Sequence, residues 1–247
     1  APARANGKAD AAVESMMAPF IDCRSLDFDA YWATRSRLMR KGQRKSWRVL
    51  GEHGTVEITT NCPSLAPKDA IDQALVYKRQ WLDKHGLRGR DIASADGGRF
   101  LNRFCEVIGD HPFAKLWITA IQVQPEGQPK RPVAIGISFE YHDRFYDYVA
   151  GFDPEFERLG VGRLQLEASL RGAFERGCGI YDFQTPATEF KARWADQQSR
   201  VDRVALPFTL RGRLYQDAYL RRLRPVMKRA YNAVVPALRK RARGDGS

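Results

Sequence analysis

Two glycines stand where an apolar helical pattern begins, in the stretch ERLGVGRLQ at residues 157–165. Glycine inside a helix costs about 0.5–1 kcal/mol relative to alanine, so a pair at a helix start indicates that the backbone comes close to another group. The first N–H groups of a helix have no partner within it, and the helix dipole favours negative charge there. With Arg163 following, the pattern predicts a phosphate-binding helix start, with a plain tight turn as the alternative.

The other residues that are suited to chemistry form no metal-binding or hydrolase motif. No H-E-x-x-H pattern occurs and no two histidines are four residues apart, so we expect no metal site at His53, His85, His111 or His142. The G-x-S-x-G elbow of serine hydrolases is also missing from the sequence. The cysteines are too widely spaced for a metal-ligand pair or a disulfide framework, which favours reduced thiols in a cytoplasmic protein: Cys23, Cys62, Cys105 and Cys178.

Two segments carry the net charge of +12. Residues 35–48 hold seven Lys or Arg and no acid, and residues 211–247 hold eleven Lys or Arg against two Asp. The rest of the chain is therefore slightly acidic, and its hydrophobic fraction of 43% suits a globular core. We expect three parts: residues 1–26, loosely held or left from an upstream domain; a globular domain over 27–210; and a basic helical tail over 211–247.

The periodicities around the glycine stretch predict a mixed α+β chain. Three short β-branched or aromatic runs separated by turns indicate an antiparallel meander. A helix that joins the third of these strands to a later strand is a β-α-β crossover, which favours a parallel pair. The expected elements are helices from Asp27 into the basic cluster and over 67–85, 97–109 and 163–176, and strands over 56–59, 115–124, 133–140, 144–150, 180–183 and 201–208.

The glycine stretch resembles the Q/R-x-x-G-x-G/A pyrophosphate loop of the GNAT acyltransferase superfamily. Glu157 replaces the first Gln or Arg of that pattern, and Arg158 is one place out of register. Residues 151–194 also resemble the acetyltransferases associated with cellulose and exopolysaccharide biosynthesis, with Pro186 where that branch usually has glycine. The shared features are an aromatic-x-Pro-x turn, G-x-x-x-x-D-F and aromatic-K-x-x-W/F, here Phe152/Pro154, Gly177/Asp182/Phe183 and Phe190/Lys191/Trp194.

This resemblance implies the GNAT acyl-CoA N-acyltransferase fold: a mixed central sheet with a splayed parallel strand pair, flanking helices and, here, the basic tail. Acyl-CoA would be the co-substrate, with no metal. Its pantetheine arm would lie between the strands at 144–150 and 180–183, with its pyrophosphate on the glycine loop. The implied CoA-binding residues are Phe152, Arg158, Gly160, Val161, Gly162 and Arg163.

An amine that attacks a thioester needs a base for its proton and a donor for the oxyanion. The chain also resembles the Fem-type peptidyltransferases, in which a lysine in an F-K-x-x-F context serves the active centre. That resemblance implies that Lys191 stabilises charge or orients the substrate. Asp182 is then the base or the partner that positions Lys191, and a purely structural ion pair between the two is the alternative. Glu140 and Glu189 are further candidates for the base.

Together these features predict an enzyme that moves an acyl group from acyl-CoA to an amine or hydroxyl of an envelope-related acceptor, such as an amino sugar, a polysaccharide or a lipid amine. Two other functions stay open. One is an aminoacyl-tRNA-dependent transferase, in which residues 35–48 would contact RNA. The other is a non-catalytic GNAT-like domain that docks on a membrane or an envelope complex.

The tail over 211–243 mixes cations with Leu, Tyr and Val at near-helical spacing. Such a segment suits contact with anionic lipid at the inner face of a membrane. A solvated helix that packs its apolar side on the globular domain is the alternative. Pro225 and Pro236 interrupt the helical pattern, and no nucleic-acid-binding module is recognised, which argues against a nucleic acid as the tail's partner.

Overall fold

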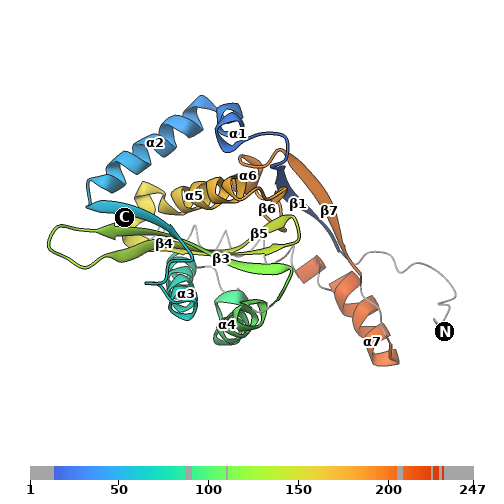
Figure 1. Cartoon of the computed structure of the whole chain (residues 1–247). Coiled ribbons are helices and arrows are strands. Elements are labelled where there is room, and N and C mark those ends of the chain that lie inside the picture. The colour runs from blue at the N-terminus through green and yellow to red at the C-terminus, as the bar shows by residue number, and fades with distance from the viewer. Residues whose placement is uncertain are drawn as a thin grey trace, which may run out of the picture. The chain divides into compact units, whose positions relative to one another are not determined.

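A computed structural model describes residues 14–86, 91–109, 111–204, 208–223, 225–227 and 230. The chain divides into two compact units, one of residues 18–199 and one of residues 1–17 with 200–247. The first of these holds most of the sheet and all of the predicted site residues (Figure 1). Among the described residues, no helix is both long enough and apolar enough to cross a membrane.

A seven-stranded mixed sheet is the centre of the fold, in the order β2-β3-β4-β5-β6-β1-β7. The predicted three-strand meander is confirmed as β3, β4 and β5, which pair in antiparallel succession, and β2 pairs antiparallel with β3 at its edge. The predicted parallel pair is confirmed as well, because β5 and β6 run parallel and α5 joins them. The strands are β1 Glu14–Asp22, β2 Thr55–Thr60, β3 Ala114–Gln124, β4 Arg131–Tyr141, β5 Arg144–Phe152, β6 Ile180–Asp182 and β7 Gln197–Arg203.

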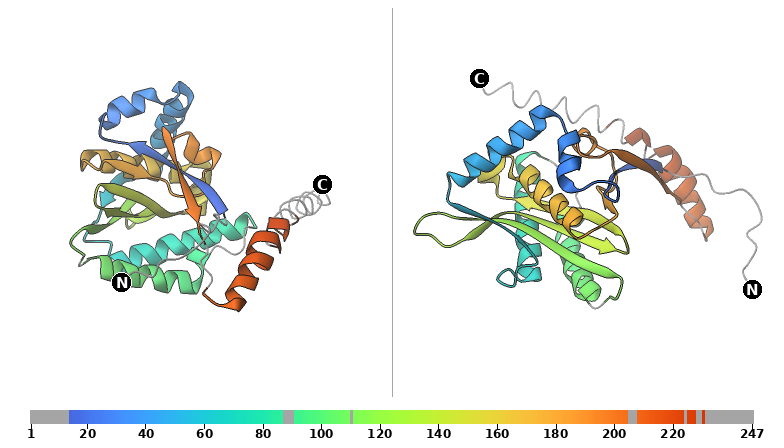
Figure 2. Two further views of the ribbon diagram at one scale, coloured as in Figure 1. Left: turned by 90° about the vertical axis from the view of Figure 1, so that its right-hand side faces the viewer. Right: turned by 45° about the horizontal axis from the view of Figure 1, so that its top comes forward.

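Helices cover both faces of this sheet (Figures 1 and 2). On one face α3 (Pro67–Lys84) and α4 (Ala95–Gly109) pack against β3, β4 and β5 through a fully apolar cluster. On the other face α5 (Val161–Glu175) packs on the sheet, and α1 (Phe28–Thr34) and α2 (Arg37–Gly51) lie outside it. Buried Gln43 ties α2 to α5 by donating from Nε2 to the Arg163 carbonyl oxygen at 3.0 Å and to Glu167 at 2.8 Å.

The segment from Asp27 to the basic cluster forms two helices, where the sequence predicts one. Arg35 takes an extended conformation after α1, and Ser36 then caps α2 by accepting a hydrogen bond from the Met39 N–H. A serine side chain at this position satisfies a first-turn N–H that would otherwise lack a partner. The break therefore follows from local capping, which the apolar spacing alone does not reveal.

The ends of the chain also differ from the prediction. Within residues 1–26, expected to be loosely held, Glu14–Asp22 form β1, which pairs with β6 in the register Phe20↔Asp182. The last strand covers 197–203 instead of 201–208, and residues 205–207 lie outside the described residues. In the tail, Leu210–Leu214 form α7 and Tyr215–Leu223 a π-helical stretch. The predicted helix beyond residue 230 lies outside the described residues.

Candidate active site at the separation of β5 and β6

Strands β5 and β6 pair over three residues and then separate. Their register runs from Arg144↔Ile180 to Tyr146↔Asp182, where β6 ends, whereas β5 continues to Phe152. Just beyond the last pair, β5 contains a bulge that leaves Tyr148 as an extra residue opposite β4. The edge of β5 that follows Tyr146 thus lacks a β6 partner, and at its start the Asp147 carbonyl oxygen accepts a hydrogen bond from the Gln184 side chain instead. This is the splayed parallel pair that the sequence predicts.

The glycine loop lies at the far end of this unpaired edge. Gly160 has φ +71°, a left-handed conformation that favours glycine, and it forms the N-terminal boundary of α5 without a side-chain cap. A Cβ on Gly162 would lie 2.9 Å from the Phe152 ring, so the second glycine lets α5 pack closely on the end of β5. Among the described residues, the N–H groups of Val161 and Gly162 make no hydrogen bond. The loop fits a phosphate group in this respect.

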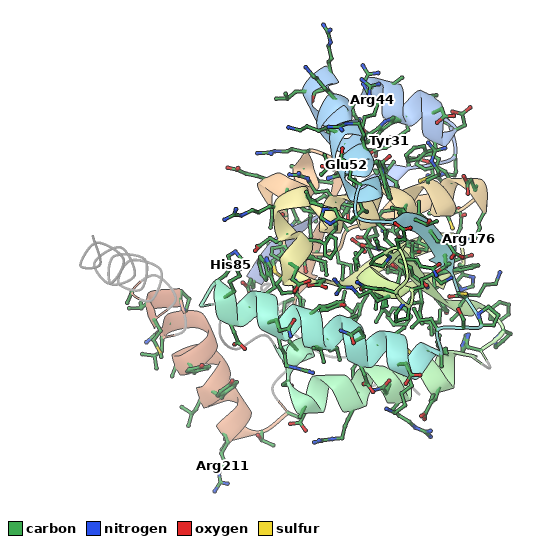
Figure 3. The ribbon with its side chains drawn as sticks, turned by 90° about the vertical axis from the view of Figure 1, so that its left-hand side faces the viewer. Tyr31, Arg44, Glu52, His85, Arg176 and Arg211 are labelled. Carbon is green, nitrogen blue, oxygen red and sulfur yellow. The ribbon has the colours of Figure 1, made fainter. Side chains whose placement is uncertain are left out.

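The charges around the loop explain how it accommodates an acid at position 157. Glu157 forms an ion pair with Lys84 near the end of α3, and its Oε1 lies 3.3 Å from Nε2 of the next residue, His85. Figure 3 shows His85 at this end of α3. The hydrogen bond from Lys84 holds the pKa of Glu157 below its ordinary value, so Glu157 is ionised at neutral pH and the charge of Lys84 offsets its negative charge. Arg163 lies over the loop, because a Cβ on Gly160 would be 2.4 Å from its Nη2. Positive charge therefore faces the start of α5 despite Glu157.

Asp182 and Lys191 meet through a third residue, Gln184. The buried Asp182 carboxylate accepts hydrogen bonds from Arg144 at 2.7 Å and from the Gln184 N–H at 2.7 Å. Lys191, on the short helix α6 (Glu189–Ala192), donates from Nζ to the Gln184 carbonyl oxygen at 3.1 Å. The ionic partner of Asp182 is thus Arg144 rather than the predicted Lys191. The Asp182 carboxylate thus ties the ends of β5 and β6 to the Gln184 backbone.

Asp147 is the residue of the site that the sequence analysis misses. It lies on β5 one residue past the last β5–β6 pair, and Gln184 donates from Nε2 to its carbonyl oxygen at 3.4 Å. Burial raises the pKa of Asp147 to about 6, and the nearby charges of Lys191 and Lys78 oppose that rise. Among the described residues, its carboxylate accepts no hydrogen bond. An acid inside the aromatic run RFYDYVA, in a strand expected to border the cleft, is the signal that could have identified it.

The two other carboxylates proposed as the base have different surroundings. Glu140, on β4, accepts a hydrogen bond from Trp117 Nε1 at 2.7 Å. The Glu189 side chain is 96% exposed and lies 4.0 Å from Arg193. A general base must lie within reach of the substrate's proton. Asp147 lies where β5 and β6 separate, whereas the Glu189 side chain extends into solvent, so Asp147 is the better candidate. Of these carboxylates, Asp147 combines a raised pKa with a position where β5 and β6 separate.

Comparisons with known proteins agree with this geometry. Residues 37–192 match the family model for an acetyltransferase (GNAT) domain. The crystal structure of FemX is similar with a TM-score of 0.57 at 11% identity, over 81% of this chain and 63% of that one. A conserved protein of unknown function from Bacteroides thetaiotaomicron VPI-5482 is similar with a TM-score of 0.48 at 10% identity, over 76% and 59% of the two chains. No curated protein matches the sequence.

The chain spans less than two thirds of the length of both solved structures. At 11% identity, the likeness to the FemX structure describes the fold alone. The family model, by contrast, covers more than half of the chain and includes the glycine loop, the separated strands and Lys191. A seven-stranded mixed sheet with a glycine-started helix after its parallel cleft strand is the arrangement that the sequence resemblance implies. On these grounds the chain belongs to the acetyltransferase (GNAT) family.

Proposed function

We propose that the protein transfers an acyl group from acyl-CoA to an amine, in the cleft between β5 and β6. The observation that carries the proposal is the unpaired edge of β5, which joins the two ends of the site. From Asp147 to Phe152 the strand rises about 17 Å, at roughly 3.3 Å per residue. This length is comparable with that of an extended pantetheine arm. The arm would place its pyrophosphate at the start of α5 and its thioester beside Asp147 and Lys191.

In this reaction the amine nitrogen attacks the thioester carbonyl carbon, a C–N bond forms and the C–S bond breaks. Asp147 accepts the proton that the amine loses, and the CoA thiolate leaves and is protonated from solvent. Lys191 supplies positive charge near the oxyanion, and Asp182 with Arg144 holds the Gln184 backbone in place. A base with a pKa near 6 is ionised at neutral pH and still strong enough to take part in proton transfer.

Calorimetric titration with acetyl-CoA, CoA and a long-chain acyl-CoA tests the proposed donor. We expect binding by the wild type, and a loss of at least about tenfold in affinity for Arg163→Glu, equivalent to about 1.4 kcal/mol. The substitution is chosen because Arg163 is exposed, whereas a large side chain at Gly162 would collide with Phe152. Arg99→Glu makes the same charge change at an exposed position on α4, and this variant should bind acyl-CoA like the wild type.

An aminoacyl-tRNA donor is the second candidate, and the surface of α2 favours it. Five cations recur along one exposed face of that helix: Arg37, Lys41, Arg44, Lys45 and Arg48. Figure 3 shows Arg44 on this helix. A tRNA titration in the same calorimeter shows which of the two donors the protein binds. Repeating it at higher salt tests whether phosphate contacts carry the tRNA binding, because such contacts weaken steeply with salt. Binding of tRNA with no binding of any CoA compound would replace our proposal by this alternative.

A further inference from the structure

A pocket of about 460 Å³ lies between α4 and the β4–β5 hairpin, on the face of the sheet that α3 and α4 cover. Its walls are mainly aromatic. Phe104 meets Phe139 edge-on at 4.8 Å between ring centroids, and Phe139 meets Tyr148 at 5.3 Å. Phe104, Val107 and Tyr148 are 37%, 55% and 38% exposed, so the pocket opens to solvent. A cavity of this size accommodates a small organic ligand.

Gln184 joins this pocket to the proposed reaction centre, which consists of Asp147 and Lys191. Its side chain lines the pocket and donates to the Asp147 carbonyl oxygen, and its own carbonyl oxygen accepts from Lys191. Tyr148, the extra residue of the β5 bulge, also lines the pocket next to Asp147 in the chain. A ligand in this pocket thus contacts Gln184, which in turn contacts both Asp147 and Lys191.

The lining determines what kind of ligand fits. Of the ten described residues that line the pocket, none is Asp, Glu, Lys or Arg, and the polar groups are tyrosine hydroxyls, His111 and Gln184. A sugar would bury many hydroxyls here, and each one left without a hydrogen bond costs free energy. An alkyl chain or an aromatic ring needs no such partners and gains from contact with Phe104, Phe139 and Val107.

We infer that this pocket holds the apolar body of the acceptor, an alkyl or aromatic primary amine whose nitrogen enters the reaction centre past Gln184. The inference rests on the proposed function, since it assigns the acceptor of the same site. It selects the lipid-like class among the acceptors that the sequence suggests, and it disfavours amino sugars and polysaccharides.

Binding of n-octylamine, 2-phenylethylamine and glucosamine, each measured by calorimetry without any acyl donor, tests the inference. We expect the two apolar amines to bind at least tenfold more tightly than glucosamine. Val107→Asn places an uncharged polar amide at the pocket mouth and should weaken octylamine binding at least tenfold. Ile58→Asn is the matched control, because Ile58 on β2 is similarly exposed at 51% and lies outside the pocket. This control should leave octylamine binding unchanged.

Glucosamine binding as tight as octylamine binding, or octylamine binding that Val107→Asn leaves intact, would overturn the inference. Circular dichroism of both variants shows whether each is folded. If Val107→Asn fails to fold, Val107→Ser provides the same comparison with a smaller polar change. Acetyl-CoA binding, measured separately on the same proteins, reports on the proposed function. Its absence from the wild type would refute acyl-CoA transfer, whereas the amine data would still decide what the pocket holds.

Discussion

At the scale of single residues, the site depends on which carboxylates already have partners. Asp182 has Arg144 and a backbone N–H, whereas no hydrogen bond to the Asp147 carboxylate is found among the described residues. Asp147 is half-buried, and an acid that loses part of its hydration resists ionisation, so its ionised form costs the native state free energy. The same property that suits Asp147 to accept a proton therefore makes it a destabilising residue at neutral pH.

Asp147→Asn should lower kcat by about 100-fold or more, since general bases contribute about 10²–10⁴. The pKa of Asp147 is about 6 in the native state and about 3.9 when unfolded, so wild-type stability falls as pH rises from about 4 to above 6. The Asp147→Asn variant has no carboxylate at this position, so its stability does not fall over this pH range for that reason. We expect it to be more stable than the wild type by about 1–3 kcal/mol at pH 8 and equally stable below pH 4, as measured by urea unfolding.

Asp83→Asn, an exposed aspartate on α3, is the control for the loss of one charge and should change neither activity nor the pH dependence. An Asp147→Asn enzyme with wild-type kcat would exclude Asp147 as the base. Loss of activity without the gain in stability at pH 8 would mean that the carboxylate has a partner in solution. Retained acyl-CoA binding in an inactive variant distinguishes an enzyme from a docking domain of the same fold.

At the scale of elements, sequence periodicity predicts those that have one apolar face. The helix α3 and the strands β3, β4 and β5 lie within a few residues of the predicted ranges. Helix α3 and strands β3 and β4 each bury several side chains in one apolar cluster, to which β5 adds Val149. The strand β1 has no such regular pattern, and its strand structure depends on pairing with β6, far away in the sequence. Likewise, the environment of Asp147 arises from α3, α6 and β5 together, which no local pattern contains.

The packing of α3 on β5 gives an element-scale prediction. A Cβ on Gly151 of β5 would lie 2.0 Å from the Ala74 carbonyl oxygen of α3, a backbone atom that cannot rotate away. Gly151→Ala should therefore push α3 from the sheet and cost about 1–3 kcal/mol of unfolding free energy. Gly42→Ala on α2 meets nothing within 4 Å and should stabilise the protein by about 0.5–1 kcal/mol. Urea unfolding of both variants measures the contrast, and equal stability would refute the close approach.

At the scale of the whole molecule, positive charge and exposed apolar side chains occur together in the second unit. Its described helical residues expose Leu210, Leu214 and Tyr215 at 79%, 70% and 55%, beside the exposed cations Arg211 and Arg222. The segment after residue 210 carries eleven Lys or Arg against two acids. Cations near an anionic lipid surface contribute about 1 kcal/mol each, and apolar side chains add to this on insertion. We therefore propose that this segment contacts membranes, which is one of the two roles that its sequence leaves open.

We expect the full chain to sediment with vesicles that contain about 30% anionic lipid and not with neutral vesicles, because the attraction is mainly electrostatic. Raising the salt from about 0.1 to 1 M shortens the screening length from about 10 to 3 Å and should release the protein. Leu210→Ser with Leu214→Ser should weaken binding without changing the net charge. Leu38→Ser, an exposed leucine on α2, is the control. Binding that ignores lipid charge would refute the electrostatic contact. Binding that survives the double substitution while Leu38→Ser abolishes it would assign the contact to α2 instead.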